Sequence, residues 1–142
     1  IFCNMLINTE LLDAVSEKAM NCDRLRMNFN LHDSLDAKAQ RLLNALQIGT
    51  VLPIHRHTQT AETYIVLRGV IKVFFYDDNK ELTDTFILDP KQGNYGVHIP
   101  VSQWHTLEVM EDDTVIFEVK DGPYRPLKPE DIMDISANTQ QP

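Results

Sequence analysis

Hydrophobic and polar residues follow two different periods along this chain. Between Thr9 and Met20, apolar residues return every three or four positions, whereas from Arg24 onward apolar and polar residues mostly alternate. The first period is typical of an amphipathic helix and the second of strands with one buried face. We therefore predict a helix over about residues 9–21, a β-barrel over about 24–120 and an extended tail over 121–142.

The predicted strands are short and separated by turn-forming residues. Runs rich in β-branched and aromatic residues alternate with clusters of Gly, Pro, Asn and Asp, which favour turns. The predicted strands cover residues 24–30, 63–67, 70–76, 83–88, 97–99, 105–110 and 114–120. Short strands at this spacing predict a mainly β sandwich or barrel.

Residues 33–47 fit two different structures. Good helix formers follow Ser34, which could cap a short helix. Residues 40–47 fit equally well a strand that leads into the next segment. We favour the strand, because Gly49 follows at a position typical of a turn.

Composition and charge narrow the class of protein. A chain of 142 residues with 43% hydrophobic and 24% charged residues fits one globular domain, residues 1–142. Its net charge of -8 argues against nucleic acid or an anionic membrane as a partner. No apolar run is long enough to span a bilayer, and the first residues lack the basic lead-in of a signal peptide. Cys3 and Cys22 have no metal-ligand spacing, so we expect free thiols in a cytoplasmic protein of bacterial type.

Two histidines stand one residue apart near the centre of the chain. In a strand, His55 and His57 would point to the same face, and Arg56 would point to the other face in a structural role. Glu62 follows the short polar stretch 58–61, which is long enough to form a loop that returns its carboxylate to the histidines. Imidazole nitrogens and a carboxylate oxygen are typical ligands of divalent transition metals.

A further histidine, His105, can add a third imidazole from a different strand. The alternative for His105 is a partly buried structural histidine, and Glu62 either binds the metal or only lies near it. The predicted metal ligands are His55, His57, Glu62 and His105, and the predicted cofactor is one divalent transition metal (Fe, Mn, Ni, Co or Zn). Such a site leaves positions open for water or a bidentate substrate.

The spacing of these residues resembles that of a known family. The pattern Gly49-x5-His55-x-His57-x4-Glu62-x6-Gly69 looks like the first motif of the cupin superfamily. The resemblance implies a double-stranded β-helix, or jelly-roll barrel, with a metal centre. Together with the helix predicted above, it gives a mainly β, single-domain cupin with an N-terminal helix.

The second cupin motif is matched less completely. Pro100-x-Ser102-x-x-His105 resembles it, but Ser102 stands where the motif has glycine and Val109 where it often has asparagine. A narrower likeness is to the small WbuC-type cupin-fold metalloproteins. The stretches that suggest it are 26–32, 40–46, 53–57, 104–106 and 118–124. This resemblance implies a link to bacterial surface-polysaccharide synthesis but no defined reaction.

Polar strand faces supply candidate substrate contacts. Arg26 and Asn28 lie on the polar face of strand 24–30, which faces either solvent or a pocket, and Glu118 and Lys120 share one face of strand 114–120. Such groups suit an anionic or hydroxylated small molecule such as a sugar. The predicted catalytic residues are Lys120, Glu118 and Tyr124, and the predicted substrate-binding residues are Arg26, Asn28 and Gln59.

Three functions fit these features. The first is a metal-dependent enzyme that modifies a sugar or sugar nucleotide as an isomerase, epimerase or lyase, or an oxygenase if the metal is iron. The second is a non-catalytic cupin that binds or senses a small ligand, and the third is a structural barrel. A titratable group near a metal-bound ligand would favour the enzyme, whereas a pocket lined only by apolar groups and metal would favour the binding protein. By analogy with cupins, whose β edges often pair, we expect a homodimer.

Overall fold

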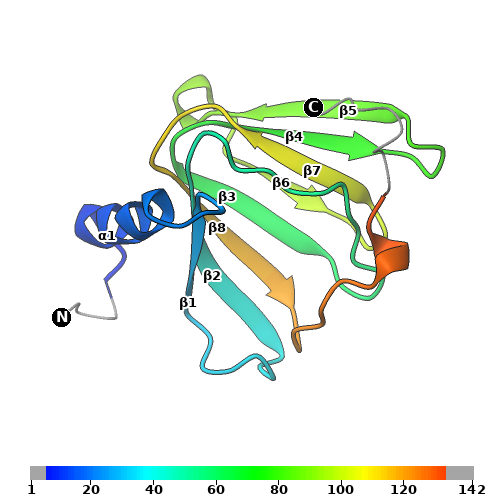
Figure 1. Cartoon of the computed structure of the whole chain (residues 1–142), viewed down its shortest axis with the longest axis horizontal. Coiled ribbons are helices and arrows are strands. Elements are labelled where there is room, and N and C mark those ends of the chain that lie inside the picture. The colour runs from blue at the N-terminus through cyan, green and yellow to red at the C-terminus, as the bar shows by residue number, and fades with distance from the viewer. Residues whose placement is uncertain (1–5, 134–142) are drawn as a thin grey trace.

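The computed structural model describes residues 6–133 and contains one α-helix and eight strands (Figure 1). The elements in chain order are α1 (Thr9–Met20), β1 (Arg26–Asn30), β2 (Ala39–Leu46), β3 (Glu62–Arg68), β4 (Ile71–Tyr76), β5 (Leu82–Leu88), η1 (Pro90–Gln92), β6 (Gly96–Ile99), β7 (Trp104–Val109), β8 (Thr114–Asp121) and η2 (Pro129–Asp131), where η marks a 3-10 turn. The chain is mainly β with an N-terminal helix, as the hydrophobic pattern predicts.

The strands form two antiparallel sheets. One sheet has five strands in the order β1-β2-β8-β3-β6, and the other has three in the order β5-β4-β7. Figure 1 shows the two sheets as facing layers that diverge toward β1 and β2, with α1 outside the larger sheet.

Helix α1 packs on the outer face of the five-stranded sheet. The Asn8 side chain accepts a hydrogen bond from Leu11 N at 3.0 Å and so caps the helix. Leu11 and Val15 are buried against Leu43 and Val115 of the sheet. The apolar positions at helical spacing therefore predict both the helix and the face that it buries.

The main core lies between the two sheets. Inward-facing residues of β3, β4, β7 and β8 form one apolar cluster, which includes Val66, Ile71, Leu107 and Ile116. The same inner face of β8 continues from Ile116 to Glu118 and Lys120, because side chains two residues apart share a face. The interior thus changes from apolar to polar along β8.

Residues 33–47 contain a strand, β2, as we favoured, and no α-helix. β2 lies between β1 and β8, so its backbone groups pair on both sides. Six of its eight residues are buried, and five of these form an unbroken run from Leu42 to Leu46. Burial between two strands outweighs the helix propensity of this stretch.

Other predictions concern features outside the sheets. Among residues 6–133, no helix is long and apolar enough to cross a membrane. Cys22 is a free thiol, whereas Cys3 and the part of the predicted tail beyond residue 133 lie outside the described residues. The single-domain extent, the cytoplasmic location and the homodimer stay predictions.

Candidate metal centre

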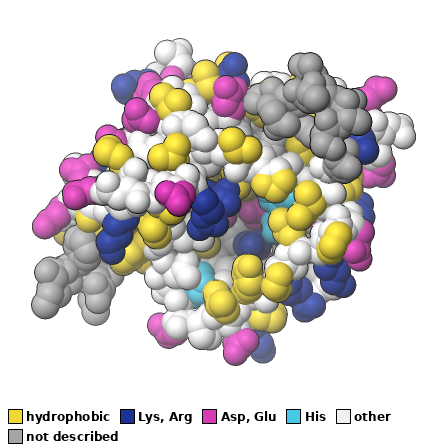
Figure 2. Space-filling model, in the orientation of Figure 1, with side chains coloured by type: hydrophobic (Ala, Val, Ile, Leu, Met, Phe, Trp, Pro, Cys, Tyr) yellow, Lys and Arg dark blue, Asp and Glu magenta, His cyan; other side chains and the backbone are white. Residues whose placement is uncertain are grey.

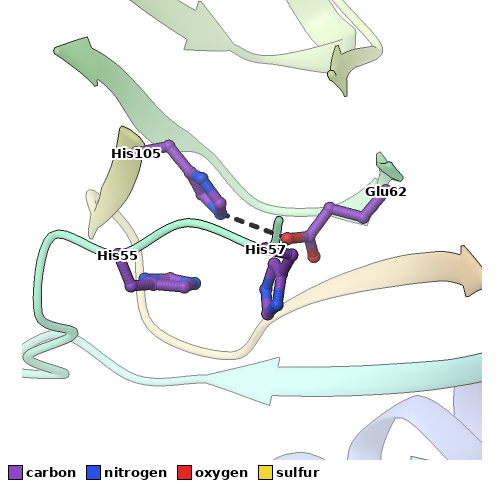
Figure 3. A group of neighbouring side chains, drawn as sticks. All are labelled: His55, His57, Glu62 and His105. Atoms are coloured by element: carbon purple, nitrogen blue, oxygen red, sulfur yellow. Dashed lines mark ion pairs between the residues drawn. The ribbon is translucent and has the colours of Figure 1, made fainter. Parts of the chain in front are cut away.

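Four side chains from three separate segments converge on one region (Figure 3). His55 and His57 lie in the loop between β2 and β3, Glu62 begins β3, and His105 is the second residue of β7. Each offers one ligand atom, and these atoms lie within 4.8 Å of one another. Figure 3 shows the three imidazoles and the carboxylate directed toward a common region. The two sheets and the loop therefore assemble the set predicted from the sequence.

The backbone that carries the first two histidines differs from the prediction. We expected a strand, but residues 51–61 are irregular, and only His55 makes β-bridges, to His105 and to Ile132. His55 N donates to His105 O at 3.0 Å, and His105 N donates to His55 O at 2.9 Å. Pro53 has no N–H to extend this pairing. The predicted strand was therefore wrong, although the side chains of His55 and His57 still converge.

Backbone carbonyls fix the tautomers of two histidines. Nδ1 of His55 lies 2.9 Å from Pro53 O, and Nδ1 of His105 lies 2.9 Å from Gln103 O. A carbonyl oxygen only accepts hydrogen bonds, so each Nδ1 carries the proton and each Nε2 presents a lone pair. Such an outer hydrogen bond is the usual support of a metal-binding histidine.

The Glu62 carboxylate lies close to two of the imidazoles. Glu62 Oε2 lies 3.0 Å from His57 Nε2 and 3.2 Å from His105 Nε2. Neither contact has the alignment of a hydrogen bond, and within the described chain Glu62 Oε2 and His105 Nε2 are buried without a hydrogen-bond partner. Two acceptors at this distance repel unless a proton or a metal cation lies between them. Three imidazoles and one carboxylate are a donor set that fits a divalent transition metal.

Burial tunes the protonation of these ligands. Burial and the neighbouring His105 lower the pKa of His55 to about 3, so its imidazole is neutral at neutral pH. Burial by itself disfavours the Glu62 carboxylate, but His105 and His57, when a proton lies on the facing ring nitrogen, outweigh burial and hold the pKa of Glu62 well below its usual value. A neutral His55 imidazole and an ionised Glu62 carboxylate are the protonation states that metal binding requires.

Arg56 points away from the centre and anchors the loop. Its Nε donates to Asp131 Oδ1 at 3.1 Å, and its guanidinium lies 4.5 Å from the centre of the Trp104 ring. Arg56 N also donates to Asp131 O at 3.0 Å. These contacts tie the histidine loop to η2 and β7, which is the structural role predicted for Arg56.

A cavity of about 300 Å³ opens onto the metal centre. Figure 2 shows a hollow on this face in which histidine, acidic and basic side chains are visible. The cavity lining includes His55, His57 and Glu62 together with five of the predicted pocket residues, which are Arg26, Asn28, Glu118, Lys120 and Tyr124. The polar face of β1 therefore lines a pocket, which was one of its two alternatives. Gln59 is not part of this lining and instead borders a neighbouring cavity.

Glu118 has an unusual environment within this cavity. Asn44 Nδ2 donates to Glu118 Oε1 at 2.8 Å, which holds the carboxyl group in place. Burial and the negative charge of Glu62 raise the pKa of Glu118 to about 7. A carboxyl group with this pKa can both donate and accept a proton near neutral pH.

This raised pKa predicts a pH-dependent stability difference. A carboxyl whose pKa rises on folding stabilises the folded state below its unfolded pKa of 4.5, and this contribution is lost as pH rises toward 7. In metal-free protein, the free energy of unfolding of Glu118→Gln, relative to that of wild type, should therefore rise by about 2 to 3 kcal/mol between about pH 5 and about pH 8. Urea unfolding at both pH values measures this difference.

A control variant is needed because the lowered pKa of His55 makes stability change with pH in the opposite direction. Its lowered pKa makes the folded state less stable as pH falls below 6.5. Glu111→Gln removes an exposed carboxylate in the β7–β8 turn and leaves His55 and Glu118 in place. The same pH-dependent gain in Glu111→Gln, or none in Glu118→Gln, would contradict the assignment.

Tyr64 and Asn44 are among the cavity residues that the sequence did not identify. Tyr64 is buried and lines the cavity, and burial and the nearby Glu62 carboxylate raise the pKa of its hydroxyl well above the ordinary value. Tyr64 lies two residues from Glu62 on the same strand face, and this spacing is the signal in the sequence that could have placed it in the cavity. Asn44 lies on β2, where the uncertain secondary structure gave no face to assign. Within the described chain, its buried Oδ1 has no hydrogen-bond partner.

The chain resembles one family of domains in sequence and several solved structures in fold. A family model described as a domain of unknown function (DUF6016) matches residues 7–88, and no curated protein matches the chain. The capsular polysaccharide assembling protein CapF from Staphylococcus aureus superposes with a TM-score of 0.62 and 20% identity, over 74% of this chain and 28% of CapF. The chain thus spans less than a third of that protein.

Two further solved structures share the fold. KdgF from Halomonas sp. has a TM-score of 0.56 at 16% identity and is matched over 70% of this chain and 82% of its own. The Cnp3 cupin domain of Schizosaccharomyces pombe has a TM-score of 0.54 at 10% identity, over 68% of this chain and 64% of its own. The fold is therefore a cupin fold, as the two histidine motifs indicate, whereas the narrower WbuC-type likeness stays a prediction.

Proposed function

The chain belongs to the family described as a domain of unknown function (DUF6016), and we propose that it is a metal-dependent enzyme acting on a sugar or sugar-nucleotide derivative. The proposed reaction is an isomerisation, an epimerisation or a lyase reaction. One observation carries the proposal: Glu118 and Lys120 line the same cavity as three of the four candidate metal ligands. A proton-transfer group beside a metal centre is the feature that distinguishes an enzyme from a binding protein here.

The chain's own residues supply binding and proton transfer. A bound divalent metal would act as a Lewis acid that polarises an oxygen of the substrate. Glu118, held by Asn44, is placed to exchange a proton with a molecule in the cavity. Lys120 pairs across the sheet with Glu62, so its side chain begins beside the metal centre. The ammonium group of Lys120 can stabilise negative charge that develops on the substrate.

The chemistry of the lining supports a hydroxylated or anionic substrate. Arg26, Asn28 and Asn30 come from successive inward positions of β1, and all three line the cavity. Guanidinium and amide groups are the donors that recognise hydroxyl and carboxylate or phosphate oxygens. The cupin-fold neighbour CapF is described as assembling capsular polysaccharide, which is consistent with a role in surface-polysaccharide synthesis. At 20% identity this neighbour supports the proposal without defining the substrate.

The non-catalytic binding cupin is the less favoured function. It predicts a pocket lined by apolar groups and metal, whereas this cavity contains Glu118, Lys120 and Tyr124. The oxygenase alternative depends on iron, and the ligand set also fits Mn, Co, Ni and Zn. We therefore keep the isomerase, epimerase or lyase proposal.

Ligand screening with a matched lysine pair tests the proposed function. Protein purified without added metal is analysed for its metal content and then screened by thermal shift against sugars, sugar phosphates, sugar nucleotides and organic acids. We expect a bound transition metal and at least one ligand that raises the melting temperature of wild type. That shift should disappear in Lys120→Ala and persist in Lys91→Ala, which changes an exposed lysine outside both cavities. Protein that binds no metal when metal is added, or a ligand shift that Lys120→Ala leaves intact, would contradict the proposal.

A further inference from the structure

A second cavity adjoins the metal cavity and has a basic lining. It measures about 200 Å³ and lies between the histidine loop and the segment that follows β8. We call it the rim cavity. Its lining includes Arg56, Thr58, Lys120, Arg125, Leu127 and Lys128. Figure 2 shows Lys and Arg side chains gathered at the lower right, over the region where Figure 1 places the chain after β8.

The rim cavity carries positive charge within an acidic chain. Its lining has four cationic side chains and two carboxylates, Asp121 and Asp131, although the whole chain has a net charge of -8. Asp131 is paired with Arg56 at 3.1 Å. Among residues 6–133, no ion pair involves Lys120, Arg125 or Lys128. Three unpaired cations around one small cavity repel one another and favour a bound anion.

The rim cavity and the metal cavity are continuous in their lining. His57, Lys120, Arg125 and Leu127 border both of them. Lys120 and Arg125 therefore stand at the junction, and one molecule can extend from the metal centre past them. Together the two cavities fall within the size range of an ordinary small-molecule site, which runs from about 300 to 1,000 Å³.

We propose that the rim cavity binds a phosphate group of the substrate, held by Lys120, Arg125 and Lys128, while the sugar end of the same molecule reaches the metal centre. This inference rests on the proposed function and narrows the substrate class to phosphorylated sugars, including sugar nucleotides. Thr58 and Thr60 add hydroxyl donors that suit phosphate oxygens. The apolar surface of Pro126 and Leu127 offers contact to the non-polar part of such a ligand.

Phosphate binding to metal-free protein tests this inference apart from the metal. Inorganic phosphate is titrated at low ionic strength into chelator-treated protein and followed by isothermal titration calorimetry. We expect saturable binding that weakens about tenfold in the double variant Arg125→Gln/Lys128→Gln, because each cation makes a charge-assisted contact. Lys91→Gln, an exposed lysine outside both cavities, should bind phosphate like wild type.

Competition identifies the source of the phosphate group. Glucose 1-phosphate should displace inorganic phosphate from the metal-free protein, whereas glucose should not. The inference is overturned if phosphate does not bind saturably, if the double variant binds it like wild type, if glucose 1-phosphate fails to displace it, or if glucose does. Retained metal without phosphate binding would reject the rim cavity alone. Phosphate binding in a protein that takes up no metal would reject the proposed function and leave the rim cavity as a phosphate site.

Discussion

Replacing His105 with alanine should lower the affinity for a divalent transition metal by more than about a hundredfold, because it removes a ligand rather than an outer support. His105 is 1% exposed, so solvent cannot easily replace its Nε2 as a donor. The variant also removes the imidazole that lies 3.2 Å from the buried Glu62 Oε2. Competition with a chromophoric chelator measures the affinity for Zn(II) or Co(II) directly.

His98→Ala is the matched control for this prediction. His98 is an exposed histidine of the edge strand β6, and its Nδ1 lies 3.0 Å from Thr63 Oγ1. It lies outside the cluster of candidate ligands, so His98→Ala should bind metal like wild type. Thermal unfolding of both metal-free variants tests whether each is folded. Wild-type affinity in a folded His105→Ala variant would remove His105 from the metal centre.

Replacing Gly69 with alanine should destabilise the fold by about 3 to 4 kcal/mol, which combines backbone strain with overpacking. Gly69 has a φ of 95°, a conformation that side chains disfavour. An added Cβ would lie 2.7 Å from Thr114 Cβ and 2.8 Å from its Cα, and Thr114 is fully buried. Urea unfolding of the metal-free protein measures the loss.

Gly93→Ala is the control that measures the backbone strain without a steric clash. Gly93 also has a positive φ, of 84°, but an added Cβ would meet no atom within 4 Å. We expect this variant to lose only about 1 kcal/mol, which is the cost of the backbone conformation alone. Equal losses in the two variants would show that close packing between Gly69 and Thr114 does not support the fold.

Local patterns in the sequence predicted most of the fold. The helical period of Leu11 and Val15 and the alternation along β1 and β8 reflect burial of one face, which the sequence records directly. Residues 33–47 were ambiguous because good helix formers also occur in a strand whose neighbours bury it. The sheet face on which the Asn44 side chain lies could be assigned only once β2 was placed between β1 and β8.

Residue spacing predicted the ligands of the metal centre, but it did not predict the irregular backbone of the loop that carries His55 and His57. His55 and His57 converge because long-range hydrogen bonds to β7 and η2 shape their loop, and no local pattern records such contacts. Tyr64 could have been placed in the cavity, since it shares a strand face with Glu62. The rim cavity could not have been predicted, because long-range hydrogen bonds position the chain after β8. One of them runs from Gly122 N to Lys38 O at 2.7 Å.

The central claim is that imidazoles from the loop and from β7 share one metal ion with Glu62. The most direct measurement is a crystal structure of cobalt- or zinc-loaded protein with anomalous diffraction recorded at the metal absorption edge. We predict one strong anomalous peak about 2.0 to 2.2 Å from nitrogen atoms of His55, His57 and His105 and from a Glu62 carboxylate oxygen. A fully loaded crystal with no peak among these residues, or with its metal bound elsewhere, would contradict the account.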